Sequence, residues 1–396
     1  MSALVKLRVD ANAKDESIDR SHDPLAWLPH EWEAWVRAQQ LPAFRAKQIL
    51  HWLHQRHVID PDHMHNLPNS LRAALQNTGL NQPCPIEHAE IATDDTRKLR
   101  LRLHDGHVLE TVLLPPLPHS DDDSTDDKTE QGQTAVTQCI STQVGCAMGC
   151  VFCASGVAGL QRHLSAAEII GQVCAAKAHL PATYPIRRLV FMGMGEPLHN
   201  YVALKQALQL LIHPQGLGFA PRRMIVSTSG LIPRIKDLQR DFQGQVQLAI
   251  SLHAPNDALR NRLVPVNRKY PLAELIACLH DYPQHSHHRI TIEYTLLDAI
   301  NDQLSHAGEL SRLLKGLAAK VNLIPMNPVA GSAFKAPSKA QVRRFQDALR
   351  NAGIPVFVRK QRGDDVDAAC GQLLLKSLQS KRPQRKKADA TLSSMA

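Results

Sequence analysis

Apolar residues recur every three or four positions from about residue 25 to residue 75, and this spacing predicts a small helical region. The stretch contains all four tryptophans of the chain. It also contains the basic residues Arg37, Arg45, Lys47 and Arg56, which fit either a contact with a polyanion or an ordinary solvated helix face. We expect a helical accessory domain over residues 25–85, preceded by a flexible N-terminus at 1–24.

Polar and apolar residues then alternate between roughly Ile91 and Leu114, around an Asp105-Gly106 pair. This pattern predicts a β-hairpin, which we place within residues 86–117. The following segment, residues 118–134, is acidic and has no large apolar side chain. Such a segment cannot bury enough apolar surface to fold, so we expect a disordered surface insertion.

Short β-rich runs alternate with helical stretches from residue 135 to about residue 376. Six such strand–helix units predict an α/β fold, in which a parallel sheet curls into a partial (βα)6 barrel of the TIM type. Ser165 and Glu168 have the spacing of a capping box, which predicts that the first helix begins there. In barrels of this kind, functional side chains gather at the carboxyl ends of the strands. Residues 377–396 read as a basic, disordered tail.

Composition adds three expectations to this outline. The chain has 396 residues, no apolar run long enough to cross a bilayer and no secretory signal at its start, so we expect a cytoplasmic protein without a membrane partner. In that compartment the eight cysteines favour metal binding or redox catalysis over static disulfides. A net charge of +9 is a weak indication of a polyanionic partner.

Three of the cysteines, Cys146, Cys150 and Cys153, follow the first predicted barrel strand closely. A structural zinc site takes four protein ligands, and no fourth cysteine follows in this loop. A cubane cluster needs one ligand per iron, so three thiolates leave one iron open to another group. The spacing favours a [4Fe-4S] cluster, with a zinc loop or unrelated buried thiols as the alternatives. Phe152 fits an apolar cover over such a cluster.

This loop resembles the cysteine motif of the radical S-adenosylmethionine (SAM) superfamily, whose open iron chelates SAM. From about Leu25 to Leu373 the chain resembles, more specifically, the RlmN/Cfr family of radical SAM ribosomal RNA methyltransferases. The resemblance rests on "FRAKQI", "DGHVLETVLLP", "CISTQVGCAMGCVFC", "FMGMGEPLHN", "VSTSG", "SLHAPND", "NLIPMNP" and "DDVDAACGQL", in the order of the family. It implies a [4Fe-4S] cluster and two SAM molecules per turnover.

The same resemblance implies a SAM pocket at the ends of successive strands. Glycine allows close approach of the backbone to a ligand, and Glu196 is suited to bind an ammonium group. Any single polar residue at a strand end is more often a local cap, but their placement on successive strands favours a shared ligand. The implied pocket residues are Gly195, Glu196, Ser227, Ser251, Leu252, His253 and Asn327.

Two further cysteines match the family's catalytic pair. An adenine ring carbon is electrophilic, so it cannot attack the SAM methyl group directly. The resemblance implies that Cys370 is methylated first, and that a 5′-deoxyadenosyl radical from a second SAM removes a hydrogen from this S-methyl group. It also implies that Glu110 accepts the ring proton after the carbon has added to the ring. By the same resemblance, Cys139 then attacks the sulfur of Cys370, which releases the methylated RNA and leaves a transient disulfide. A lone strand cysteine is usually a buried apolar residue, and a glutamate in an exposed hairpin is usually solvated.

The family methylates an adenosine of 23S rRNA, at C2 in RlmN-type members, some of which also act on tRNA, and at C8 in Cfr-type members. "MGMGEPLHN" and "ACGQL" resemble the RlmN side, whereas "CASGVAGLQRHL" departs from its usual wording. We therefore expect C2 methylation, with C8 methylation and a non-catalytic RNA-binding barrel as alternatives. The helical domain is expected to bind RNA, a flavodoxin or ferredoxin to donate electrons, and the enzyme to act as a monomer.

Overall fold

A computed structural model describes residues 24–116, 135–181, 183–283, 289–327, 329, 332–369 and 371–373. The predictions for residues 1–23, for the acidic insertion, for the basic tail and for Cys370 lie outside the described residues. The predicted domain boundaries stay predictions. Within the described residues, no helix is both long enough and apolar enough to cross a membrane.

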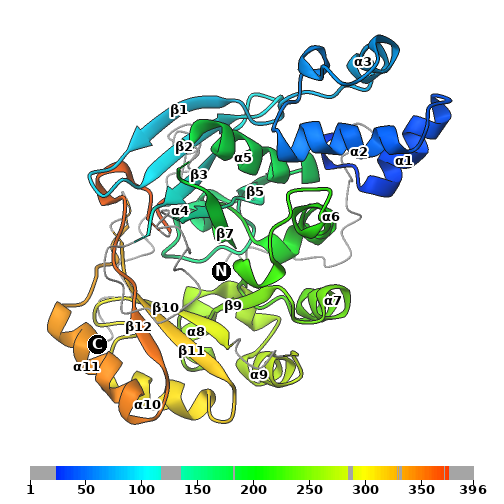
Figure 1. The fold of residues 1–396 in the computed structure, drawn as a ribbon. Coiled ribbons are helices and arrows are strands. Elements are labelled where there is room, and N and C mark those ends of the chain that lie inside the picture. The colour runs from blue at the N-terminus through cyan, green and yellow to red at the C-terminus, as the bar shows by residue number, and fades with distance from the viewer. Residues whose placement is uncertain are drawn as a thin grey trace, which may run out of the picture.

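One large sheet dominates the described part of the chain (Figure 1). Its strand order is β1-β2-β3-β4-β7-β8-β9-β10-β11-β12, and every pairing from β4 to β12 is parallel. The strands are β1 Ile86–Ile91, β2 Arg97–Arg102, β3 Val108–Leu114, β4 Val136–Cys139, β7 Ile186–Phe191, β8 Met224–Thr228, β9 Gln247–Ser251, β10 Ile290–Leu296, β11 Ala319–Pro325 and β12 Val356–Val358. Because β4 pairs with β3 rather than with β12, the barrel is open, and the predicted partial barrel is confirmed.

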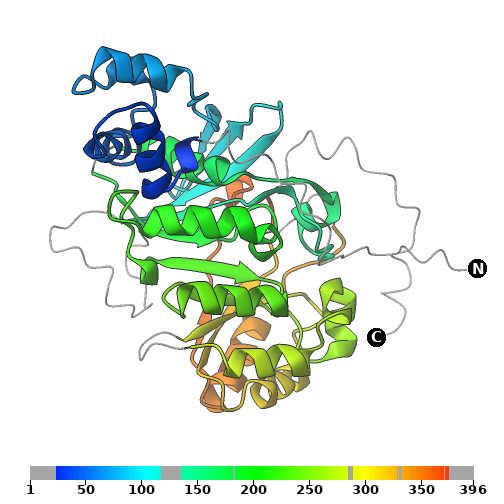
Figure 2. The same cartoon turned by 90° about the vertical axis from the view of Figure 1, so that its right-hand side faces the viewer.

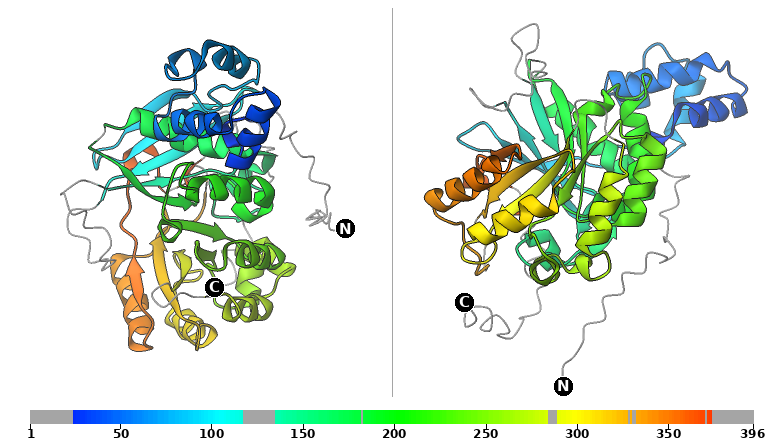
Figure 3. Two further views of the ribbon diagram at one scale, coloured as in Figure 1. Left: turned by 45° about the vertical axis from the view of Figure 1, so that its right-hand side comes forward. Right: turned by 90° about the horizontal axis from the view of Figure 1, so that it is seen from below.

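Helices cover the outer face of the curved parallel sheet (Figure 3). Figure 2 shows α6 and α7 lying side by side on this face. The helices are α1 Pro29–Ala38, α2 Phe44–Leu50, α3 Asn69–Gln76, α4 Ala154–Ala158, α5 Ala166–His179, α6 Tyr201–Ile212, α7 Ile232–Phe242, α8 Asp257–Leu263, α9 Leu272–His280, α10 Leu304–Leu313 and α11 Lys339–Asn351. The capping box at the start of α5 forms as predicted, with Ser165 and Glu168 bonding each other's backbone amides.

Strand β10 illustrates how the sequence builds the barrel wall. All seven of its residues are buried, as expected for a strand covered on both faces. Tyr294 packs against Phe345 of α11 on the outer side, so the alternate residues Thr291, Glu293 and Thr295 face the barrel interior. The structure adds a seventh parallel strand, β12, which the sequence pattern did not reveal because it has only three residues.

The predicted hairpin is part of an antiparallel extension of the main sheet. Strands β2 and β3 pair around the Asp105-Gly106 turn, β1 joins as a third strand, and β3 pairs with β4. One face of β3 buries Leu109 and Leu113 in the main core, and the other face carries Glu110 and Val112. The hairpin therefore brings a carboxyl group to the first barrel strand.

The N-terminal helices pack on the barrel instead of standing apart from it. Trp32 is fully buried in the same apolar core as α5 and α6. The side chain of Gln206 on α6 donates to the carbonyl of Ala26 at 3.0 Å, and Gln55 donates to the carbonyl of Gly216. Figure 1 shows α1 and α2 beside α5 and α6.

Candidate active site

The carboxyl ends of the parallel strands surround a cavity of about 150 Å³. Its walls come from the cysteine loop and from the ends of β7, β8, β9, β10 and β11. The lining residues that the sequence pointed to are Cys146, Cys150, Phe152, Cys153, Gly195, Glu196, Ser227, Ser251, His253 and Asn327. Leu252 is fully buried beside them but does not line the cavity.

The cysteine loop joins strand β5 (Gln143–Gly145) to α4 and brings three thiols to one cavity. The amide of Val151 donates to the carbonyl of Leu263 at 3.2 Å, which holds the loop against α8. Burial, reinforced by the neighbouring thiols, raises the pKa of Cys146 and raises that of Cys150 to about 12. Three soft sulfur donors from one loop fit a [4Fe-4S] cluster, whose binding would have to displace the thiol protons.

Glu196 is held rigidly at the wall of the cavity. One carboxyl oxygen accepts hydrogen bonds from the amide and the hydroxyl of Ser229, both at 2.8 Å, and the other accepts from the amide of Leu198 at 3.1 Å. Burial raises its pKa, whereas these hydrogen bonds act in the opposite direction. Gly195 has a φ of 105°, and a Cβ there would lie 2.6 Å from the side chain of Gln143. The glycine is therefore required for the wall to pack.

Another part of the cavity wall is both aromatic and polar. The rings of Phe152 and His253 meet edge to face with centroids 4.8 Å apart. Nδ1 of His253 accepts from the amide of Thr295 at 3.0 Å, and burial lowers the pKa of this histidine to about 3. His253 is therefore neutral at physiological pH. The hydroxyls of Ser227 and Ser251, on neighbouring strands, lie 3.3 Å apart and form one hydrogen bond with each other, so one of the two hydroxyl protons is available to a ligand.

Cys139 lies at the end of β4, is 7% exposed and packs against Ala368 and Leu373. These two residues flank Cys370, which lies outside the described residues. Gly371 lines the cavity itself. The backbone on both sides of the predicted methyl acceptor thus lies near Cys139 and near the cavity.

Glu110 is buried, which corrects the expectation of an exposed hairpin residue. Only 4% of it is accessible, and its Oε2 has no hydrogen-bond partner among the described residues. The cause is the pairing of β3 with β4, which places the hairpin face under the C-terminal segment. Burial raises the pKa of Glu110 to about 7, so this carboxyl can exchange a proton near neutral pH.

Ser141 connects Glu110 to the cavity wall. Its buried hydroxyl donates to the backbone carbonyl of Glu110 at 2.6 Å and accepts from the amide of Met194 at 2.9 Å. Gln172 of α5 bonds both the amide and the carbonyl of Ser141, each at 2.9 Å. These contacts fix the position of β3 relative to the loop that carries Glu196.

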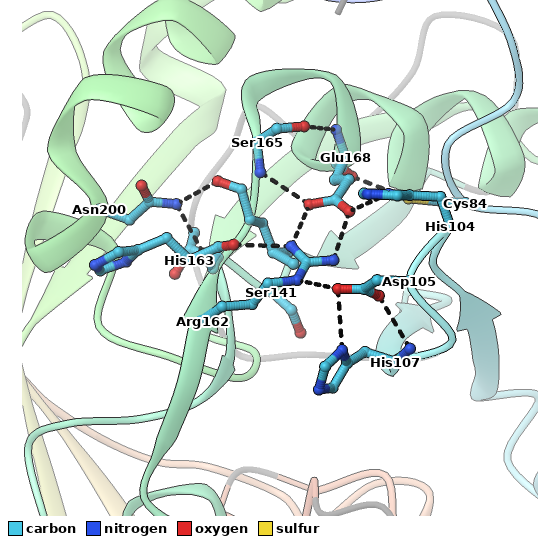
Figure 4. Close-up of polar contacts among 12 residues, drawn as sticks. Cys84, His104, Asp105, His107, Ser141, Arg162, His163, Ser165, Glu168 and Asn200 are labelled. Atoms are coloured by element: carbon cyan, nitrogen blue, oxygen red, sulfur yellow. Dashed lines mark hydrogen bonds and ion pairs between the residues drawn. The ribbon is translucent and has the colours of Figure 1, made fainter. Parts of the chain in front are cut away.

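An ion-pair network fixes the other end of the hairpin (Figure 4). Arg162, on the short strand β6 (Leu160–His163), binds both carboxyl oxygens of Glu168 at 2.8 Å and pairs with Asp105 in the hairpin turn. The paired guanidinium of Arg162 lowers the pKa of Asp105, against the effect of burial. His107 also pairs with Asp105 at 3.0 Å. The turn is thereby joined to the start of α5.

Sequence reasoning missed several cavity residues that lie inside strands or beyond the family motifs. Glu293 and Thr295 come from the middle of β10, and Arg359 follows β12. The only signal was the interruption of an apolar strand by polar residues at alternate positions. That pattern marks an inward face but does not name a ligand.

An open parallel barrel with three thiols of one loop at its strand ends defines a radical SAM protein. The pattern of the radical SAM superfamily matches residues 140–307, and that of the ribosomal RNA large subunit methyltransferase N-terminal domain matches residues 29–79. A crystal structure of a radical SAM methyltransferase from Sphaerobacter thermophilus aligns with a TM-score of 0.80 and 43% identity, covering 88% of this chain and 98% of that one.

Two relatives extend the comparison. The dual-specificity RNA methyltransferase RlmN of Sorangium cellulosum is 51% identical over 370 residues, which cover 89% of this chain and 95% of that protein. The protein of the same name from Marinobacter nauticus is 44% identical over 337 residues, covering 84% and 86%. The chain belongs to the RlmN family of radical SAM RNA methyltransferases, as the sequence motifs predicted. Membership implies a [4Fe-4S] cluster and SAM as cofactors.

Proposed function

We propose that this protein methylates C2 of an adenosine in 23S rRNA and also acts on tRNA. Its relatives carry the name dual-specificity RNA methyltransferase, which supports two RNA substrates. The observation that carries the proposal is a cavity lined by the three cluster cysteines and by Gly371, with Cys139 packed against the residues on both sides of Cys370. The buried Glu110 lies on the strand that pairs with the one that carries Cys139. A simple RNA-binding barrel would have no use for this arrangement.

Cys146, Cys150 and Cys153 would hold the cluster, and Glu196 and the two serines would orient SAM beside it. When bound, the cluster and SAM supply the one-electron chemistry that activates a methyl hydrogen. The cavity is lined partly by apolar groups such as Phe152, which keep water away from the reacting atoms.

Cys370 would accept the methyl group of one SAM. Once a hydrogen atom has left this group, its carbon would bond to the adenine ring, and the unpaired electron of the adduct would return to the cluster. Glu110 removes the ring proton, a role supported by its burial and by a pKa of about 7. The sulfur of Cys139 then forms a bond to the sulfur of Cys370, the bond between Cys370 and the methyl carbon breaks, and that carbon takes up a proton. The resulting disulfide must be reduced before the next turnover. Two SAM molecules are consumed in each cycle.

Arg37, Lys47 and Arg56 are exposed on the N-terminal helices and are suited to contact RNA phosphates. The predicted flavodoxin or ferredoxin would supply electrons, and we propose that the protein meets its RNA substrate in the cytoplasm. A monomer suffices for this account, since every proposed catalytic residue comes from one chain.

The test is to map methyladenosine isomers by mass spectrometry in rRNA and tRNA from cells with and without the gene. We expect 2-methyladenosine in both RNAs to disappear with the gene and to return when the gene is restored. Loss of 8-methyladenosine instead would support the Cfr-type alternative. Unchanged levels of both isomers would contradict an RNA carbon methyltransferase.

A further inference from the structure

Glu293 is a buried carboxyl group that faces the cavity, and one of its two oxygens accepts no hydrogen bond from the described residues. It lies on the inner face of β10 and is 4% exposed. Oε1 accepts from the side-chain amide of Asn322 at 3.2 Å, but Oε2 has no hydrogen-bond partner among the described residues. Buried carboxyl oxygens are nearly always bonded, so this one calls for a physical explanation.

Neither protonation state of Glu293 gives Oε2 a hydrogen-bond partner among the described residues. If Glu293 is ionised, Oε2 carries unpaired lone pairs in a site where burial outweighs the positive charges of Arg359 and Lys320 and raises the pKa. If it is protonated, its O–H donor lacks an acceptor among the described residues. Leaving such a group unsatisfied destabilises the free protein, and more so if the group is charged. A ligand that supplies a hydrogen bond would recover this energy.

The position of Glu293 indicates which part of a ligand it would meet. In the parallel register Glu293 lies opposite Ser251 of β9 on one side and opposite Asn322 of β11 on the other. Glu196 follows β7, three strands away, a path of roughly 14 Å along the curved sheet at the usual strand spacing. Because both carboxyl groups line the same cavity, a SAM molecule whose amino end lies near Glu196 can extend its nucleoside toward Glu293.

We propose that Glu293 is a binding residue whose free carboxyl oxygen accepts a hydrogen bond from an adenosine group, through a ribose hydroxyl or the ring amino group. This inference rests on the proposed function, in which two adenosines enter the site, one in SAM and one in the RNA. The adenosine of SAM and the adenosine of the RNA offer the same hydrogen-bond donors. The experiment must therefore distinguish binding of SAM from binding of RNA.

The first arm measures binding of SAM to anaerobically prepared, cluster-containing protein by calorimetry. Glu293→Gln keeps the shape of the side chain but removes its charge, and we expect SAM to bind at least about tenfold more weakly. The matched control is Glu309→Gln. Glu309 accepts a hydrogen bond from Asn256 and does not line the cavity, so its variant should bind SAM as the wild type does.

The second arm measures RNA methylation at saturating SAM. If Glu293 meets the target nucleotide, Glu293→Gln should leave SAM affinity and RNA-independent SAM cleavage unchanged, and lower kcat/KM for RNA at least about tenfold. Unchanged SAM affinity together with unchanged kcat/KM for RNA would overturn the proposal. A wild type that binds SAM but methylates no RNA would defeat the proposed function, and the first arm would still decide the role of Glu293 toward the cofactor.

Stability separates a binding role from a structural one. A residue that serves a ligand leaves the free protein with an unsatisfied carboxyl, so Glu293→Gln without SAM should have a thermal midpoint equal to or above that of the wild type. A lower midpoint would mean that Glu293 supports the fold, and would contradict the proposal. Glu293→Asp keeps the carboxyl but withdraws it by one methylene. This second variant should also weaken binding of whichever ligand Glu293→Gln affects.

Discussion

Glu110→Gln should make the protein more stable at alkaline pH while abolishing methylation. Burial raises the pKa of Glu110 from its ordinary 4.5 to about 7. A group whose pKa is higher in the folded state favours folding below its unfolded pKa, and this contribution is lost as the pH rises through the folded value. The folded wild type therefore loses stability between about pH 4.5 and pH 7.

The size of this loss follows from the two pKa values. At about 1.4 kcal/mol per pH unit, raising the pKa from 4.5 to about 7 corresponds to roughly 3 kcal/mol. Glutamine does not ionise, so the variant escapes this loss. The difference in stability between Glu110→Gln and wild type should grow with pH, in favour of the variant, and level off above about pH 8.

The assay is thermal unfolding of both proteins from pH 5 to pH 9 in a single buffer series. Glu33→Gln, in which the changed side chain lies on the surface of α1 beside Arg37, is the control and should show no such trend. RNA methylation by Glu110→Gln should be lost although SAM still binds. A stability difference that does not change with pH would refute the burial argument, and normal methylation would refute the role as proton acceptor.

Three further outcomes follow from the site. Cys150→Ala should remove bound iron and sulfide from anaerobically purified protein, whereas Cys174→Ala, a buried thiol outside the cavity, should keep about four of each. Arg162→Met should lower the free energy of unfolding by about 3 kcal/mol in denaturant titrations, because the buried Glu168 loses both hydrogen bonds from the guanidinium and keeps, as a cationic partner among the described residues, only the exposed His104 at 3.5 Å; a change below about 0.5 kcal/mol would contradict this. Cys139→Ala should accumulate a covalent protein–RNA adduct, seen by mass spectrometry after nuclease digestion, and free turnover by this variant would contradict its resolving role.

The fold could be predicted because its periodic patterns are strong. Apolar runs separated by amphipathic helices predicted six barrel strands, and the Ser165 capping box predicted the start of α5. Strand β12 was not predicted because three residues are too few to show an alternation of apolar and polar positions. The predicted hairpin was correct as a local structure, but its attachment to β4 is a long-range pairing that no local pattern encodes.

The residues of the site likewise fall into two groups, those that local sequence patterns predicted and those that depend on long-range contacts. Residues in loops with unusual spacing, such as the three cluster cysteines, could be found from the sequence. The burial of Glu110 could not, because it depends on how β3 meets a segment more than 250 residues further along the chain. Glu293 was missed because one acidic residue in an apolar strand looks like a local irregularity until the barrel turns it inward.

The central claim is that the methyl carbon reaches RNA through Cys370 and not directly from SAM. The most direct test is to supply SAM with a fully deuterated methyl group and to count deuterons in the methyladenosine product by mass spectrometry. One hydrogen must leave the S-methyl group before its carbon joins the ring, so the product should contain two deuterons. A product that retains all three deuterons would mean direct transfer and would contradict the mechanism.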